Sequence, residues 1–207
     1  MMTKNFEIGI LGTGCLVLAL FSPLRLGAHD GDPAPVAPPA PAARTNAVFV
    51  QSKPGDNAWN AGQAVGDWWA EIKRQHGHVG PWNVRGWRIA QAALRELTSE
   101  WGRHDLEIIC YLPPQTPFTC MVDGLSVGTG NSLGRLDLRL AEVLDCRQSF
   151  VAVRRKDGKG DILEFRPATA YLKSITNQPV EALERLSREG SERRESELFT
   201  IHRLPAG

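Results

Sequence analysis

The sequence predicts an α+β domain in which an N-terminal helix pair packs on a small mixed or antiparallel sheet, with further helices. Three observations support this fold class. Residues 56–101 carry apolar side chains at helical spacing, residues 106–112 have strand character, and residues 150–166 have the pattern of a hairpin around an Asp157-Gly158 turn. Because helical and strand patterns are interleaved along the chain, the α+β class follows.

The first helix is expected to begin at Asp56 or Asn57, either of which can cap it, and to run to about Arg74. Gly77 is a natural helix end, and Pro81 is a natural first residue of the next helix. Apolar stripes define both helices: Ala61, Val65, Trp68 and Ile72 in the first, and Trp87, Ala90, Leu94, Leu97 and Trp101 in the second.

All six tryptophans lie between Trp59 and Trp101, which predicts an aromatic seam between these two helices. The seam is either ordinary core or the wall of a site for a flat cofactor such as haem.

The remaining elements follow from local patterns. A strand is expected over 106–112, ended by Pro113-Pro114, and a short helix over 120–129. The expected hairpin strands are 150–155 and 162–166, followed by helices near 167–175 and 179–189 and a final strand or tail over 198–204.

The first 28 residues have the features of a secretory signal peptide. Lys4 gives a positive start, residues 8–21 are mostly apolar, and Ala28 ends a small-residue cleavage site. We therefore expect an exported protein, periplasmic or extracellular, with no stable membrane span after cleavage, because a span needs roughly 20 apolar residues. An uncleaved signal would serve as an N-terminal membrane anchor.

Residues 29–45 are rich in proline and alanine, which predicts an extended linker. Residues 46–207 then form one domain of ordinary length. Signal cleavage leaves basic and acidic residues almost balanced, so charge gives no reason to expect a nucleic-acid partner.

Three cysteines remain once Cys15 leaves with the signal. In an oxidising compartment Cys110 and Cys146 could pair and leave Cys120 as a metal ligand, or all three thiols could stay unpaired.

Two histidines, His76 and His78, lie in the expected junction between the first two helices. The positive end of a following helix disfavours a protonated imidazole, and the neutral form is the one that binds a metal. The alternative is that these histidines only cap the helix or bond a carbonyl group.

Cys120 and Asp123 would lie on one face of the expected helix over 120–129. Thiolate, imidazole and carboxylate groups together suit zinc, and also nickel or iron. The alternative is a buried cysteine beside a helix-capping aspartate.

Four motifs in this order resemble the formylmethanofuran dehydrogenase E-subunit-like family: His76-Gly-His-Val-Gly-Pro81, Gly86-Trp-Arg-Ile-Ala90, Cys120-Met-Val-Asp-Gly124 and Gly130-Asn-Ser-Leu-Gly134. The resemblance covers residues 69–138 and, more loosely, 150–199. It implies an α+β domain, often a homodimer, with a metal at the histidine and cysteine positions. It thus implies His78 and Cys120 as metal ligands, with His76 and Asp123 as further ligands or as groups that surround them.

The chain also departs from that pattern. Family members often have cysteine where Gly80 and Asn131 stand here, and many add a C-terminal zinc ribbon that this sequence lacks. These differences favour a zinc-like divalent metal over a soft, redox-active one.

The sequence therefore predicts an exported metal-binding protein with a His/Cys/Asp site, and it defines neither a reaction nor a small-molecule ligand. Two alternatives remain: a haem or metal carrier of the cell envelope, and a metal-free interaction module.

Overall fold

The computed structural model describes residues 62–205. The expected signal peptide, the expected linker and the first residues of the expected domain lie outside these described residues.

Within residues 62–205 a five-stranded mixed sheet forms the base of the domain. Its strands are β1 (Leu106–Leu112), β2 (Leu138–Glu142), β3 (Phe150–Arg155), β4 (Asp161–Pro167) and β5 (Phe199–Pro205). They are arranged in the order β2-β1-β3-β4-β5, with β2 parallel to β1 and every other neighbouring pair antiparallel. The predicted α+β class and the mixed sheet are confirmed.

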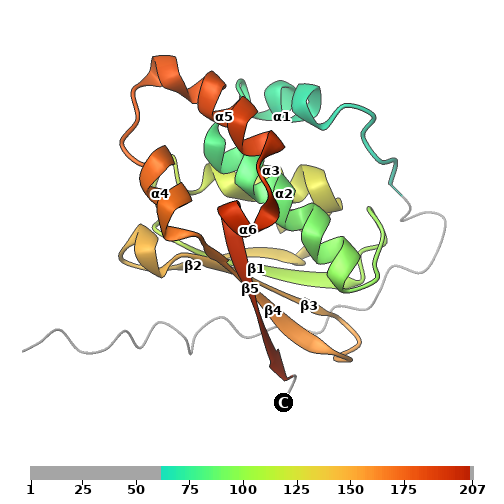
Figure 1. The fold of residues 1–207 in the computed structure, drawn as a ribbon. Coiled ribbons are helices and arrows are strands. Elements are labelled where there is room, and N and C mark those ends of the chain that lie inside the picture. Colours follow the sequence, from blue (N-terminus) through green and yellow to red (C-terminus); the bar gives the residue numbers. More distant parts are fainter. Residues whose placement is uncertain (1–61, 206–207) are drawn as a thin grey trace, which may run out of the picture. The chain divides into compact units, whose positions relative to one another are not determined.

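The helices are α1 (Trp68–His76), α2 (Pro81–Glu96), α3 (Cys120–Thr129), α4 (Thr169–Ile175), α5 (Leu183–Glu192) and α6 (Glu195–Leu198). Figure 1 shows them on one side of the sheet, with α2 between the sheet and α1. None of the helices in this part of the chain has the length and apolar character needed to cross a membrane.

The interior strand β1 is buried along its whole length, which explains why all of its residues except Glu107 are apolar or aromatic. Ile108, Cys110 and Leu112 belong to the main core together with residues of α2 and α3. Ile109 and Tyr111 belong to a smaller cluster with residues of β3. This alternation follows from the two-residue period of a strand.

The first helix begins later than predicted. Residues 62–67 are not helical, and the carboxylate of Asp67 accepts from the backbone N–H groups of Trp69 and Ala70 at 3.0 Å each. The predicted caps Asp56 and Asn57 lie outside the described residues. Gly66 stands immediately before Asp67, and glycine is a poor helix former, which favours a start at this cap.

The second helix ends at Glu96, so Leu97 and Trp101 of its predicted stripe lie beyond it. Between α1 and α2, Trp68 stacks on Trp87 with ring centroids 4.1 Å apart. The main helix partner of α2 is nevertheless α3, which α1 also contacts.

The α2–α3 crossing is unusually close because small residues recur four apart on both helices: Gly86 and Ala90 on α2, Gly124 and Gly128 on α3. A Cβ at Gly86 would lie 2.1 Å from the Met121 carbonyl oxygen, and one at Gly124 would lie 2.0 Å from the Asn83 carbonyl oxygen. The two backbones are therefore in direct contact, which fixes the start of α3 beside the start of α2.

Candidate metal centre

The predicted junction between the first two helices has the expected form. His76 is the last residue of α1, and Gly77 ends the helix in the left-handed conformation, with φ of 90° and its N–H on the Lys73 carbonyl oxygen. Gly80 caps α2 and Pro81 is its first residue. The rings of His76 and His78 lie side by side, with centroids 4.8 Å apart. We call residues 76–80 the histidine loop.

His76 is joined to α3 by its ring. Its Nδ1 lies 2.7 Å from Oδ2 of Asp123, which stands in the first turn of α3. The imidazole side chain is 17% exposed and the carboxylate side chain 44% exposed. A carboxylate that accepts from Nδ1–H fixes the tautomer whose free electron pair is on Nε2, the atom that a metal ion would then meet.

Cys120 is the first residue of α3, one helical turn before Asp123, as the predicted helix required. Its side chain is almost fully buried. Burial raises the pKa of this thiol, and the nearby Asp123 carboxylate raises it further. Without a cation close by, Cys120 is therefore a neutral thiol.

Asn83 connects the histidine loop to α3. Its Oδ1 accepts from the Gly80 N–H at 2.8 Å, and its Nδ2 donates to the Cys120 carbonyl oxygen at 2.9 Å. The side chain is completely buried. The sequence analysis did not select this residue, although a polar side chain in the first turn of a helix that starts Gly-Pro is a signal that could have identified it.

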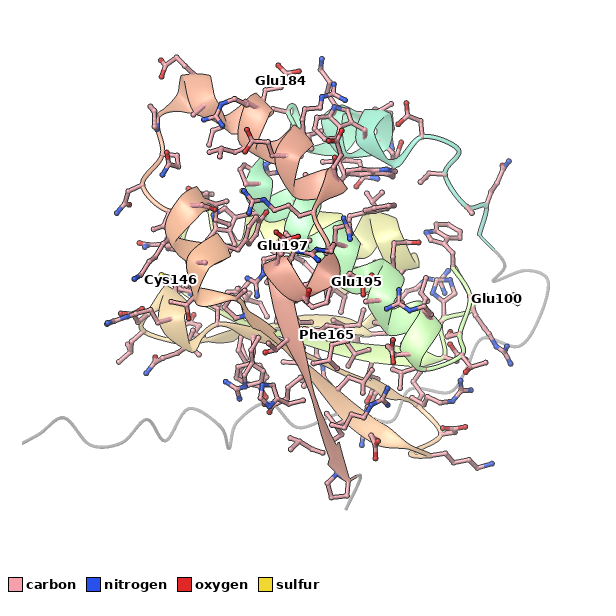
Figure 2. The ribbon with its side chains drawn as sticks, in the orientation of Figure 1. Glu100, Cys146, Phe165, Glu184, Glu195 and Glu197 are labelled. Carbon is pink, nitrogen blue, oxygen red and sulfur yellow. The ribbon has the colours of Figure 1, made fainter. Side chains whose placement is uncertain are left out.

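Three surface hollows surround the predicted residues. The Asp123 hollow, about 350 Å³, is bordered by His76, Cys120 and Asp123, with an apolar wall that includes Val122, Leu133 and Leu140. The Asn177 hollow, about 190 Å³, is bordered by His78, Trp82, Asn83, Cys120, Ile175, Asn177 and Gln178. The Trp69 hollow, about 350 Å³, is bordered by Trp69, Lys73, His78 and Glu184. Glu184 lies on α5 and is labelled in Figure 2.

Neighbouring hollows have predicted site residues in common. Cys120 borders the Asp123 and Asn177 hollows, and His78 borders the Asn177 and Trp69 hollows. The structure thus brings His76, His78, Cys120 and Asp123 to one corner of the domain.

The C-terminal half of the domain also contributes to this corner. Asn177 and Gln178 border the Asn177 hollow, and the hydroxyl of Ser187 on α5 lies 3.0 Å from the Val79 carbonyl oxygen. No local pattern in the sequence predicted these roles, because they depend on contacts between segments about 100 residues apart.

The chemistry of the donors fits a borderline divalent ion, since imidazole nitrogen, thiolate sulfur and carboxylate oxygen are all present. Among residues 62–205, however, no three His, Cys, Asp or Glu side chains are grouped closely enough to hold an ion as they stand. Cys110, Cys120 and Cys146 are all free thiols, as in the second of the two expected arrangements.

Comparison with known proteins gives one family. Residues 75–204 match the family model described as FmdE, Molybdenum formylmethanofuran dehydrogenase operon. No curated protein matches the chain.

Proposed function

The chain belongs to the FmdE family, and from this premise we propose that it is an exported protein that binds a zinc-like divalent ion through His78 and Cys120. His76 and Asp123 would complete the site, His76 through Nε2 and Asp123 either as a ligand or as the group that orients His76. The family description names the operon of a molybdenum enzyme, which associates the family with metal chemistry.

The observation that carries this proposal is the convergence of two imidazoles, a thiol and a carboxylate from two segments over 40 residues apart. The bond between His76 and Asp123 joins the two segments directly, and Asn83 joins them a second time. A Cβ at Gly80 would lie 3.5 Å from Nε2 of His78, so the position at which relatives often have cysteine adjoins the same ring.

A divalent ion held here with an open coordination position would supply Lewis acidity. The chain's own residues would hold and orient that ion and shape its surroundings. Val122, Leu133 and Leu140 give the Asp123 hollow an apolar wall, which suits a ligand that carries an aliphatic part. Cys120 must lose its proton to bind, so ion binding would release a proton from this site.

Metal content tests the proposal. The double variant His78→Ala with Cys120→Ser should lose the ion that the native protein retains, measured by elemental analysis after purification without a metal-binding tag. The matched control is His202→Ala with Cys146→Ser, which removes an exposed histidine of β5 and a partly buried thiol elsewhere. Equal metal content in the native protein and the His78/Cys120 variant would contradict the assignment.

The same sample separates the two alternatives. A Soret absorption band would indicate a haem carrier, with the tryptophans of α1 and α2 beside the haem. Native protein without metal or haem would indicate a metal-free interaction module, in which the histidines only serve the helix junction.

Export and dimerisation are part of the proposal. The mature protein should begin at His29, which N-terminal sequencing of the protein from the cell envelope or the medium would establish. Light scattering on the mature protein should give twice the mass of one chain.

A further inference from the structure

Arg85 of α2 is completely buried, and its charge faces no acceptor in the described part of the chain. Its three guanidinium nitrogens, Nε, Nη1 and Nη2, have no hydrogen-bond partner among residues 62–205. Trp82 lies three residues earlier on the same helix and is 2% exposed. Its indole Nε1 also has no hydrogen-bond partner among residues 62–205. The guanidinium carbon lies 5.6 Å from the centroid of the Trp82 ring. Within residues 62–205, four buried donor nitrogens thus lie in one part of the core without an acceptor.

The polar groups around Arg85 do not neutralise it. Cys110 of β1 is a neutral thiol, because burial raises its pKa to about 12. The Tyr171 hydroxyl of α4 donates to the Pro81 carbonyl oxygen, and burial raises its pKa to about 12 as well. Burial lowers the pKa of Arg85 only to about 10, so the guanidinium stays charged at neutral pH.

Another buried cation of the domain, Lys156, has the negative partner that Arg85 lacks among the described residues. Lys156, also buried, donates to the buried carboxylate of Asp137 at 3.2 Å. Leaving a charge buried and unpaired strongly destabilises a protein, so a cation in this position needs a negative partner. For Arg85, residues 62–205 do not supply one.

We propose that Arg85 and Trp82 form a binding site for a small monovalent anion, either free or as the carboxylate of a small organic acid. The planar guanidinium offers a fork of donors that matches a carboxylate, and the indole N–H adds a further donor. Trp82 also borders the Asn177 hollow, and its ring centroid lies 5.6 Å from the Arg85 guanidinium carbon, so this residue adjoins both the hollow and Arg85. Rotation of this ring would let an anion reach the guanidinium while an organic tail stays in the hollow, whose volume of about 190 Å³ limits the ligand to a few heavy atoms.

Thermal unfolding of the full chain tests this site with sodium chloride, formate and butyrate, each against the sodium salt of a bulky sulfonate at the same ionic strength. Binding to the folded state alone should raise Tm by about 5–10 °C at a hundred times the dissociation constant. A rise with chloride or formate indicates a free anion, and a larger rise with butyrate indicates the carboxylate of an organic acid. Both results support the site, and a Tm that does not depend on the anion would overturn it.

Variants connect the effect to these residues. Arg85→Met should abolish the rise in Tm, and Trp82→Phe, which removes the indole donor and keeps a ring, should reduce it. The matched control is Arg88→Met, because Arg88 is on the same helix, is only partly buried and donates to the Ser191 carbonyl oxygen; this variant should respond as the native protein does. An unchanged response in Arg85→Met would contradict the assignment.

A crystal of the native protein soaked in bromide provides a measurement that does not depend on the variants folding. Anomalous scattering should place bromide within hydrogen-bond distance of Arg85, and a map without that peak would contradict the site. The anion site does not rest on the proposed metal, and Arg85→Met should leave metal content unchanged. Failure of one proposal therefore leaves the other intact.

Discussion

The α2–α3 crossing and the candidate metal centre are built on the same two helices, but they are held together in opposite ways. At the crossing, Gly86 and Gly124 bring backbone against backbone with no room for a methyl group. At the centre, His78 is exposed and Asp123 is 44% exposed, and a single bond joins His76 to Asp123. The rigid crossing fixes where the donor residues stand, while their side chains keep the freedom to adjust to an ion.

The crossing should be the more sensitive of the two regions. Gly124→Ala places a Cβ 2.0 Å from the Asn83 carbonyl oxygen, so the helices must separate, at a cost of about 4 kcal/mol or more in the free energy of unfolding. Denaturant unfolding measures the loss.

The control for the crossing is Gly134→Ala, since a Cβ there would meet only the Ser132 hydroxyl, at 4.0 Å. The free energy of unfolding of this variant should differ from that of the native protein by no more than about 0.5 kcal/mol. Similar small changes in both variants would mean that the crossing adjusts easily.

An intermediate effect is expected where the two regions meet. Asn83→Ala leaves the Gly80 N–H and the Cys120 carbonyl group without their partner, which should cost about 2–3 kcal/mol of stability. It should also weaken metal binding about 10- to 100-fold, because the histidine loop loses its attachment to α3. Calorimetric titration with zinc measures the second effect.

Gln91→Ala is the matched control for Asn83. Gln91 lies on the same helix and donates to the Gly128 carbonyl oxygen at 3.0 Å, away from the histidine loop. Its loss should cost about 1 kcal/mol or less and leave zinc affinity unchanged. Equal zinc affinities in Asn83→Ala and the native protein would show that Asn83 only stabilises the fold.

The smallest effect on stability is expected at the centre itself. Asp123→Asn removes a partly exposed charge, so the free energy of unfolding should change by no more than about 0.5 kcal/mol. Zinc affinity should fall about tenfold or more, because the amide no longer holds the His76 tautomer as the carboxylate does. If Asp123→Asn instead lost as much stability as Asn83→Ala, the His76–Asp123 hydrogen bond would serve to stabilise the histidine loop.

Elements with strong local signals were predictable from the sequence. The strand at 106–112, the helix at 120–129 and the hairpin agree with the structure because each is specified by its own apolar pattern and turn residues. Strand β2 was missed: it is a short edge strand in which buried, partly buried and exposed residues are mixed, and its parallel pairing with β1 is a long-range contact. The start of α1 was placed too early because the Asp67 cap competes with two earlier candidates.

The candidate site was only partly predictable for a related reason. Residue chemistry and spacing identified His76, His78, Cys120 and Asp123, and the structure places them at one corner. The roles of Asn83, Arg85 and Asn177 arise from segments that meet only in the folded domain. Two of them carried usable signals: Asn83 lies in the first turn of a helix that starts Gly-Pro, and Arg85 shares the buried face of α2 with Trp82 and Ile89.

The contact between Ser187 and the Val79 carbonyl group has a consequence for the order of events during biosynthesis. The histidine loop emerges from the ribosome about 100 residues before the helix that closes over it. A nascent chain consequently exposes both imidazoles before α5 contacts the histidine loop, so the proposed metal site would be complete only when translation is almost finished. If the chain crosses a membrane unfolded, the proposed site would take its ion from the compartment of destination and not from the one where the chain is made.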